Sequence, residues 1–366
     1  MNASPAVTAQ QLILAEDRGR KVWAEHRPDH QGYPRLVSRV LAPGKLPVEL
    51  LRELLESGAP EPPELRVGPR IGEDACAIDL PAGTLVAASD PITLTGSDVG
   101  AHAVVVNAND VAVMGVRPRW FLATILLPVG TDEASVRGIF KSMRRALEDL
   151  DVTLVGGHTE VTSSVVQPVV VGQMMGLAET GNVVLTAGSM PGDRVVQVGP
   201  VPVEGAAVLA LEARDQLGSV DAGLLEQAAK AIRQPGISVV EAALAAARLG
   251  ATSLHDPTEG GLAAGLIELA EASGVRLRID PEAVLWFEPG LAVCHALGAD
   301  PWATLASGAL LATFTADVAP SACAELQRKA APARVIGSAE VGSGVTLEGR
   351  GDLQSPERDE VARVLG

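Results

Sequence analysis

Apolar residues recur along this chain with two different periods, one typical of strands and the other typical of helices. Short apolar runs at 84–89, 120–127 and 194–198 predict buried strands. Between 132 and 150 the apolar residues repeat at helical spacing, which predicts an amphipathic helix that begins at the acidic pair Asp132-Glu133. The apolar face of this helix consists of Val136, Ile139, Phe140, Met143, Leu147 and Leu150.

The same two patterns continue through the rest of the chain. Further helices are predicted at 101–114, from Gly205 onward, at 238–249 and at 261–272, with Gly274 as a stop signal. Further strands are predicted at 152–155 with a break at Gly156-Gly157, at 165–177 near an edge or bulge because of Pro168, at 275–280 and at 308–315. Strands that alternate with helices predict an α/β fold. Aromatic residues make up only 2% of the chain, so its cores must be built from Val, Leu, Ile and Ala.

Length and turn signals predict how the chain is divided. Its 366 residues correspond to two domains at roughly 150 residues each. The turn Pro191-Gly192-Asp193 places the boundary near 187–193. One helix is predicted from Val7 to Glu25, before the first domain, and another over 48–55, near the start of that domain. The predicted segments are an N-terminal extension at 1–45, an N-terminal domain at 46–186, a C-terminal α/β domain at 187–345 and a tail at 346–366.

Composition excludes several classes of partner and location. The net charge is −16, and no basic stripe is present, which disfavours a nucleic-acid partner. The chain has neither a signal-peptide pattern nor an apolar run of about 18 residues, so no membrane association is expected. Its cysteines, Cys76, Cys294 and Cys323, form no paired motif and are expected to be reduced thiols. Together these features predict a cytoplasmic protein.

Common nucleotide and catalytic motifs are absent from the sequence. There is no G-x-x-x-x-G-K-[ST] phosphate loop and no G-x-G-x-x-G dinucleotide fingerprint. Zinc-ligand spacings and the G-x-S-x-G nucleophile motif are also missing. If this protein binds a nucleotide, it must use other groups to hold it.

Four short segments instead place acids or amides near the ends of predicted elements, most of them beside glycine. They are Gly72-Glu73-Asp74, Ser89-Asp90-Pro91, Asn107-Ala108-Asn109-Asp110 and Gly156-Gly157-His158-Thr159-Glu160. Carboxylates from several elements can converge on Mg²⁺, which prefers oxygen ligands and is usually bound together with substrate phosphates. Glycines let the backbone approach those phosphates closely. Asp90 and the segment 156–160 are expected at the carboxyl ends of strands, where ligands bind in open α/β sheets.

Each segment also has a simpler structural explanation. Asp74 could cap a turn, and Asp90 before Pro91 is a common turn pair. The polar side chains at Asn107, Asn109 and Asp110 lie in an otherwise apolar helix, where they need either a partner or solvent. His158 could be a hydrogen-bonded loop histidine rather than a metal ligand. Only the joint order of the segments favours a functional site.

That order, followed by Asp256-Pro257-Thr258-Glu259-Gly260-Gly261-Leu262, resembles the aminoimidazole-ribonucleotide (AIR) synthase superfamily over residues 46–361. The likeness is greatest to the AIR synthase-related branch that resembles the hydrogenase maturation factor HypE. The resemblance implies a PurM-like two-domain fold, in which the N-terminal domain contributes strands to a β-barrel shared by a homodimer. It also implies that ATP and Mg²⁺ bind near that interface.

Site residues are carried over from the same motifs. The resemblance implies that Asp74, Asp90 and Asp110 hold Mg²⁺ and that Asp110, Asp256 and His158 are catalytic. The implied nucleotide-binding set is Gly72, Glu73, Asp74, Asp90, Asn107, Asn109, Gly156, Gly157, Glu160, Thr258, Gly260 and Gly261.

Three departures from the family pattern affect these expectations. The maturation factor ends in a reactive cysteine, whereas the last cysteine of this chain is Cys323, so that chemistry is not expected. His158 stands where the kinases and the maturation factor usually carry Asp, so the metal set could be smaller or shifted to Glu160. The loop from Gly199 to Gly205 contains two prolines, which remove backbone donors that could bind phosphate.

Three functions therefore remain open. The first is ATP-dependent phosphoryl transfer to an unidentified small-molecule or protein acceptor, where positioning and charge neutralisation supply most of the catalysis. The second is a non-catalytic nucleotide- or partner-binding protein on the same fold. The third is a thiamine-monophosphate kinase or AIR synthase, which His158 and the form of the 256–262 motif disfavour.

Overall fold

The computed structural model describes residues 13–17, 20–24, 63–67, 72–93, 98–179 and 182–366. Two compact units are distinguished, one at 1–42 and one at 43–366. In the first unit, β1 (Ile13–Asp17) and β2 (Arg20–Ala24) pair as an antiparallel hairpin. The helix predicted from Val7 to Glu25 is therefore wrong over these strands. The helix predicted at 48–55 lies outside the described residues.

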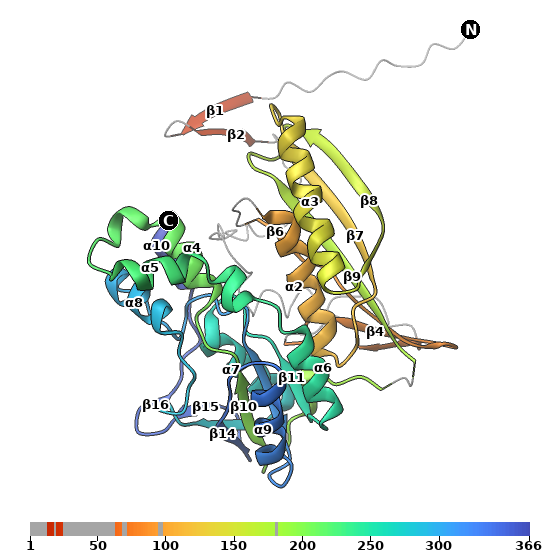
Figure 1. Ribbon diagram of the computed structural model, residues 1–366, viewed down its shortest axis with the longest axis vertical. Helices are drawn as coiled ribbons and strands as arrows, with labels where there is room; N and C mark the ends of the chain where they lie inside the picture. Colours follow the sequence, from red (N-terminus) through yellow and green to blue (C-terminus); the bar gives the residue numbers. More distant parts are fainter. Residues whose placement is uncertain (1–12, 18–19, 25–62, 68–71, 94–97, 180–181) are drawn as a thin grey trace, which may run out of the picture. The chain divides into compact units, whose positions relative to one another are not determined.

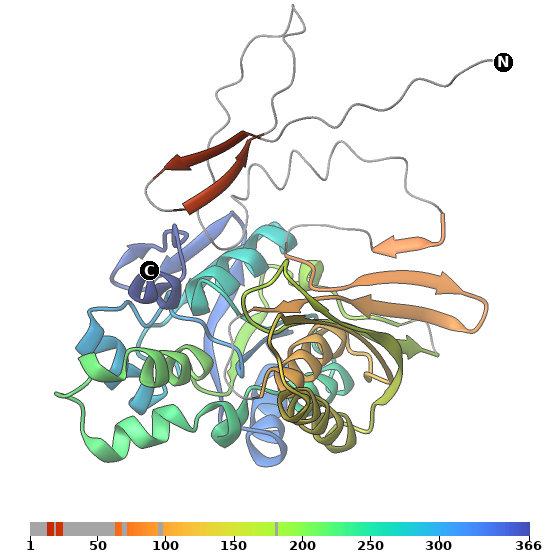
Figure 2. The same ribbon diagram turned by 90° about the horizontal axis from the view of Figure 1, so that it is seen from above.

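The second unit contains two separate sheets. Over the described residues, the first sheet has seven strands in the order β3-β4-β5-β9-β7-β8, with β6 paired to β9. These strands are β3 (Leu65–Val67), β4 (Cys76–Leu80), β5 (Gly83–Ala88), β6 (Pro91–Ile92), β7 (Trp120–Pro128), β8 (Thr153–Thr162) and β9 (Val169–Ala178). Helices α2 (Val99–Val113) and α3 (Glu133–Asp149) pack on one face of this sheet (Figure 1), and Figure 2 shows both on the same side.

The second sheet lies in the C-terminal half. Its described strands follow the order β11-β13-β10-β14-β12-β15-β16. They are β10 (Arg194–Val198), β11 (Ser253–His255), β12 (Arg276–Ile279), β13 (Leu310–Phe314), β14 (Ala333–Glu340), β15 (Gly344–Leu347) and β16 (Gly351–Asp352). The described helices of this half are α4 (Glu204–Glu212), α5 (Ala222–Ala229), α6 (Val240–Arg248), α7 (Gly261–Ser273), α8 (Glu288–Leu297), α9 (Ala319–Lys329) and α10 (Glu360–Leu365), with short turns η1 (Thr186–Gly188), η2 (Arg214–Gln216) and η3 (Ile232–Gly236).

The cores of the two halves are continuous. Phe121 and Ile125 of β7 pack with Met143 of α3 in a cluster that extends to α6 and to Phe314 of β13. A second cluster lies beneath α7, and a third joins α4, α5, α8 and α10. Burying these apolar side chains against each other holds the N-terminal sheet and the C-terminal sheet in one body.

Two strands differ from the sequence-based expectation. β8 does not break at Gly156-Gly157 but continues to Thr162 as a parallel neighbour of β7. The motif at 156–160 therefore lies within a strand rather than beyond its carboxyl end. β9 begins after Pro168, as the proline requires, but it lies between β5 and β7 rather than near an edge. Among the described helices, none is both long and apolar enough to cross a membrane.

Candidate functional site

The segment Gly72-Glu73-Asp74 docks the N-terminal half onto the C-terminal half. Gly72 has a φ of +85°, and a side chain there would crowd Ala272 and the Glu268 carbonyl of α7. Glu73 accepts hydrogen bonds from the backbone N–H groups of Thr186 and Ala187 at 3.4 and 3.3 Å. Burial raises the pKa of Glu73. These contacts fix the turn against α7 and η1.

Asp74, the last residue of this turn, contacts a buried histidine. His255, at the end of β11, has a side chain that is only 2% exposed. Its Nδ1 lies 2.9 Å from Asp74 Oδ2, and its Nε2 lies 3.0 Å from Glu268 Oε2. Burial alone would lower the pKa of His255, but Asp74 and Glu268 raise it well above the usual value. His255 therefore carries a proton at neutral pH and donates one hydrogen bond to each carboxylate.

Asp256 follows directly and brings a further carboxylate to the same place. It is 3% exposed, and burial raises its pKa well above the usual value. The charges of Asp74 and Asp90 raise the pKa further, while protonated His255 opposes them. Asp74 and Asp90, which belong to two other sequence-predicted segments, thus lie close enough to Asp256 for their charges to act on it. We call Asp74, Asp90 and Asp256 the acid cluster.

The asparagines of α2 fix the backbone around this cluster. Asn107 Oδ1 accepts from the Asp90 N–H at 2.8 Å, and Asn107 Nδ2 donates to the Asp90 carbonyl at 3.2 Å. Asn109 bridges to the start of α6, donating to the Ile237 carbonyl and accepting from the Val239 N–H, both at 2.9 Å. Both asparagines are at most 1% exposed. Both asparagines thus fix the surrounding backbone, and the nucleotide contact that the resemblance implies for them stays a prediction.

The chemistry of the cluster suits a hard cation. Its donors are all carboxylate oxygens, which Mg²⁺ prefers. Within the described part of the chain, no group of three or more His, Cys, Asp or Glu side chains is arranged to hold a metal ion by itself. Substrate phosphates and water would have to complete the coordination, as is usual for Mg²⁺. Asp110 lies in α2, one turn after Asn107, and is 6% exposed.

The 256–262 motif forms the turn that starts α7. Gly260 and Gly261 have φ angles of +80° and +67°, and a Cβ on Gly261 would meet the Trp302 and Thr304 carbonyls. The Thr258 carbonyl accepts from the Gly261 N–H at 3.0 Å. From the C-terminal tail, Asp359 Oδ2 accepts from the Gly260 N–H at 2.7 Å. Burial raises the pKa of Asp359 to about 6.

The motif on β8 stands apart from the acid cluster. Gly156 to Glu160 are exposed along the edge strand of the sheet. At Gly157 a Cβ would overlap the Ala123 carbonyl of β7, so this glycine permits close strand pairing. His158 Nε2 lies 3.2 Å from Glu160 Oε2. Across the register from His158 through Thr124 and Val171 to Pro91, three strand spacings amount to roughly 14 Å. Within one chain, His158 is therefore not brought to Asp90.

A cavity lies beside the β8 motif, and a glycine- and proline-containing loop precedes α4. A cavity of about 180 Å³ between β8 and α3 is lined by Ala123, Ile125, Phe140 and Met143, among others. In the loop from Gly199 to Gly205, the N–H groups at Gly199, Val201 and Gly205 already donate to backbone carbonyls, so these three are not available to a phosphate.

Sequence reasoning missed three residues that organise the site. His255 and Glu268 hold Asp74, and Asp359 caps the turn at Gly260. His255 immediately precedes the 256–262 motif, and a histidine directly beside the aspartate of that motif could have drawn attention. Glu268 carries no comparable signal, because it is one of two acids on α7, with Glu271 one turn later.

Comparisons with known proteins identify the family to which the chain is similar. The family model "AIR synthase related protein, N-terminal domain" matches residues 72–178, and its C-terminal counterpart matches 190–350. The hydrogenase expression/formation protein HupE of Azotobacter chroococcum is 33% identical over 261 residues, covering 68% of this chain and 72% of that protein. The carbamoyl dehydratase HypE of Azotobacter vinelandii is 33% identical over 257 residues, covering 67% and 71%.

Solved structures show the same fold. A crystal structure of a HypE–HypF complex aligns with a TM-score of 0.68 at 24% identity, covering 84% of this chain and 99% of that one. The hydrogenase maturation protein HypE in complex with ATP aligns with a TM-score of 0.66 at 25% identity, covering 81% and 92%. The two-domain, mixed α/β arrangement expected from the sequence is thereby confirmed.

Proposed function

Because the chain belongs to the AIR synthase related protein family, we propose that it binds Mg·ATP at the acid cluster and transfers a phosphoryl group to an acceptor. The convergence of Asp74, Asp90 and Asp256 from three separate motifs is the observation that carries this proposal. The relative solved with ATP supports the choice of nucleotide. The relatives named carbamoyl dehydratase and thiamine-monophosphate kinase support an enzymatic role.

In this proposal Asp74, Asp90 and Asp110 hold Mg²⁺, as the sequence motifs imply, and Asp256 extends the set. When bound, Mg²⁺ would neutralise charge on the phosphate oxygens. The protein positions the carboxylates that would hold the ion. His255 and Glu268 fix the Asp74 carboxylate, and Asn107 fixes the backbone at Asp90. Such an arrangement suits phosphoryl transfer, which depends on placement and electrostatics more than on a protein nucleophile.

We also propose that the protein is a homodimer through the first sheet. The strand residues that face away from α2 and α3 are largely apolar and only half-buried, among them Leu122, Leu126, Val171 and Met175. On β8, Val155 and Val161 are 50% and 56% exposed. The register places His158 and Glu160 beside Thr124 and Leu126 on this face. A second copy on this face would give His158 and Glu160 the interfacial location that the family pattern implies. The mass of the full chain in sedimentation tests whether it is a dimer.

Thermal unfolding with and without Mg·ATP tests the nucleotide proposal. ATP at about 100 times its Kd should add roughly 2.7 kcal/mol to the stability of the wild type, which raises Tm by several degrees. The shift should require Mg²⁺ and should be lost in Asp90→Asn and Asp110→Asn, which change charge but not shape. Asp317→Asn removes an exposed carboxylate before α9 and should keep the full shift.

The contrary outcomes distinguish the remaining functions. A wild type without any shift from ATP, ADP or GTP contradicts the proposal. A Mg-dependent shift without phosphate release or acceptor phosphorylation supports a non-catalytic nucleotide-binding protein, which the occupied N–H groups of the 199–205 loop favour. Phosphorylation of thiamine monophosphate would identify the kinase activity of one of the relatives. The acceptor itself is a small molecule or a protein, and the solved complex of HypE with HypF supports a protein partner.

A further inference from the structure

The C-terminal tail, residues 353–366, contacts the turn that starts α7. It lies beyond the residues that the two family models match. Asp359 directly precedes α10, and its Oδ1 accepts from the Val361 N–H at 2.8 Å. Its Oδ2 accepts from the Gly260 N–H at 2.7 Å. One carboxylate therefore caps α10 and also bonds to a glycine 99 positions earlier in the chain.

The tail is anchored through α10, and Asp359 connects it to the turn. Val361 is 2% exposed and packs in the apolar cluster that joins α4, α5 and α8. Figure 1 shows α10 beside α4, near the C-terminus of the chain. Residues 354–358, which lead to Asp359, are exposed or half-buried. The bond between Asp359 and Gly260 can therefore open while Val361 stays packed.

Neighbouring N–H groups of the turn donate to backbone carbonyls instead. The Gly261 N–H donates to the Thr258 carbonyl at 3.0 Å, and the Ala263 N–H donates to the Trp302 carbonyl at 2.9 Å. These acceptors are fixed by the fold. The Gly260 N–H differs from them because its acceptor is a side chain, which can rotate away or leave with the tail. An incoming anion can therefore replace Asp359 at Gly260 without disturbing the backbone.

The turn also lies close to the acid cluster. Gly260, which the sequence motifs imply for the nucleotide, follows Asp256 by four residues, so no more than roughly 14 Å of backbone separates the two. A triphosphate bound with Mg²⁺ at Asp256 can span that distance. Asp359 places a negative charge at the turn, and Glu259 and Glu360 lie near enough to act on it. A phosphate that approaches Gly260 therefore finds its donor occupied and is also repelled.

We propose that the C-terminal tail is autoinhibitory: Asp359 occupies the Gly260 N–H, and the phosphates of an incoming nucleotide must displace it. The autoinhibition rests on the Mg·ATP binding proposed above. Any change that releases Asp359 from the turn should raise the affinity for nucleotide. A purely structural Asp359 predicts the opposite sign, because the turn would lose support and bind nucleotide more weakly once Asp359 is removed.

Two variants of Asp359 test the sign of the effect. Asn and Ser both keep a favourable cap for α10. Asp359→Asn has the same shape without the charge, and with its one oxygen on the cap its amide cannot accept from Gly260. Asp359→Ser also leaves space beside Gly260. Calorimetric titration of the full chain with Mg·ATP should show a Kd about threefold lower in Asp359→Asn and about five- to tenfold lower in Asp359→Ser than in the wild type.

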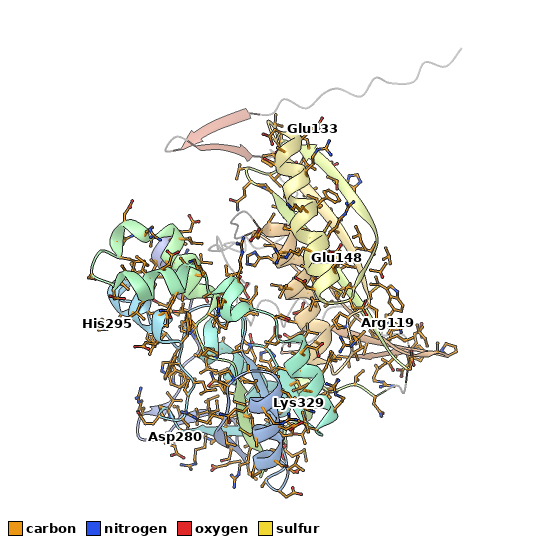
Figure 3. The ribbon with its side chains drawn as sticks, viewed as in Figure 1. Arg119, Glu133, Glu148, Asp280, His295 and Lys329 are labelled. Atoms are coloured by element: carbon orange, nitrogen blue, oxygen red, sulfur yellow. The ribbon has the colours of Figure 1, made fainter. Side chains whose placement is uncertain are left out.

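Two matched controls remove a carboxylate elsewhere. Glu357 lies in the same tail, two positions before Asp359, and is exposed. Glu148 is also exposed and lies on α3, which packs on the first sheet (Figure 3). Glu357→Gln and Glu148→Gln should bind Mg·ATP as the wild type does. Thermal unfolding of every variant is recorded first, so that affinities are compared among folded proteins.

The pH dependence gives a readout that a structural role would not produce. Burial raises the pKa of Asp359 to about 6, with Glu259 and Glu360 adding to the effect. Its other titratable or charged neighbours are Arg363 in α10 and Cys294 in α8, and burial raises the pKa of that thiol to about 11. Protonated Asp359 resembles Asn. The Kd of the wild type relative to Asp359→Asn should therefore be about threefold higher at about pH 7.5 and should approach equality at about pH 5. Protonation of ATP and of the acid cluster affects both proteins and cancels in this ratio.

Two results would overturn the proposal, and they differ in what they leave standing. A wild type that binds Mg·ATP, with an unchanged or higher Kd in both Asp359 variants, would leave the proposed function intact and make Asp359 structural. Absence of binding in the wild type and in both variants would contradict the proposed function and the autoinhibition together. If Asp359→Ser does not fold, the Kd of Asp359→Asn and its pH profile decide.

Discussion

Two histidines of this protein make nearly the same hydrogen bond in very different surroundings. His255 bonds Asp74 and Glu268 at 2.9 and 3.0 Å, and its side chain is 2% exposed. His158 bonds Glu160 at 3.2 Å, and its side chain is 64% exposed. Coulomb interactions are weakened by surrounding water and strengthened by its exclusion, so the first contact should contribute far more to stability than the second. Burial, rather than distance, separates the two histidines.

The comparison also separates two kinds of motif. The His255 contacts connect segments far apart in the chain and join the N-terminal half to α7. The His158 contact is local to one strand, and that strand lies at the edge of its sheet. The first motif is therefore complete within one chain, whereas the second is exposed and open to a second copy in the proposed dimer.

Replacing His255 by Ala should give the largest effect. The change leaves Asp74 and Glu268 close together without the cation between them, and breaking a buried ion pair typically costs about 3–5 kcal/mol. The two carboxylates are 24% and 30% exposed and can recover some hydration, so we expect a loss near the lower limit, about 3 kcal/mol. Urea unfolding followed by circular dichroism measures this loss.

The matched variant for that experiment is His255→Gln, which keeps one neutral hydrogen bond and should lose less stability than His255→Ala. A loss below about 1 kcal/mol in His255→Ala, the range of an exposed pair, would show that the buried contact does not hold the halves together.

Local signals explain which parts of the fold could be predicted. The helix at 132–150 was found from its apolar period, and its start is fixed by Asp132, which accepts from the Ser135 N–H at 2.8 Å. The stop at Gly274 is confirmed by a φ of +64° at the end of α7. These features are decided by residues within one or two turns of each other.

Non-local pairing explains what was wrong or missed. The run from Thr153 to Thr162 contains two glycines and several polar residues, and only its pairing with β7 makes it one continuous strand. The acids of the site were recognised from their order in the sequence. Their partners were not, because Asp74 and His255 are 181 positions apart. No pattern within a window of a few turns could bring those two side chains together.

A pH titration of stability should sharpen the comparison. The pKa of folded His255 is raised above its unfolded value of about 6.5, so its contribution is fully present below that pH and is lost as pH rises through the folded pKa. The difference in unfolding free energy between wild type and His255→Gln should therefore be largest near pH 6 and should shrink at alkaline pH. Subtracting the two curves cancels the titration of most other groups.

Glu268→Gln serves as the control for this titration. It removes one of the two carboxylates that raise the His255 pKa. The stability contributed by protonated His255 should therefore begin to fall at a lower pH than in the wild type. If the difference in unfolding free energy between wild type and His255→Gln grew between neutral and alkaline pH, it would contradict the assignment of His255 as protonated.

Replacing His158 by Ala should give the smallest effect. Its pair with Glu160 is exposed at 64% and 49%, and pairs of this kind contribute about 0–1 kcal/mol. We expect less than about 0.5 kcal/mol of lost stability for the monomer, measured by the same urea unfolding as for His255. The measurement should be repeated at low and high protein concentration, because the proposed dimer would place His158 against a second copy and couple its loss to association. A cost that appears only at high concentration would support an interfacial role for His158. A large cost that does not depend on concentration would instead mean that the β8 motif, like Asp74, is stabilised within its own chain.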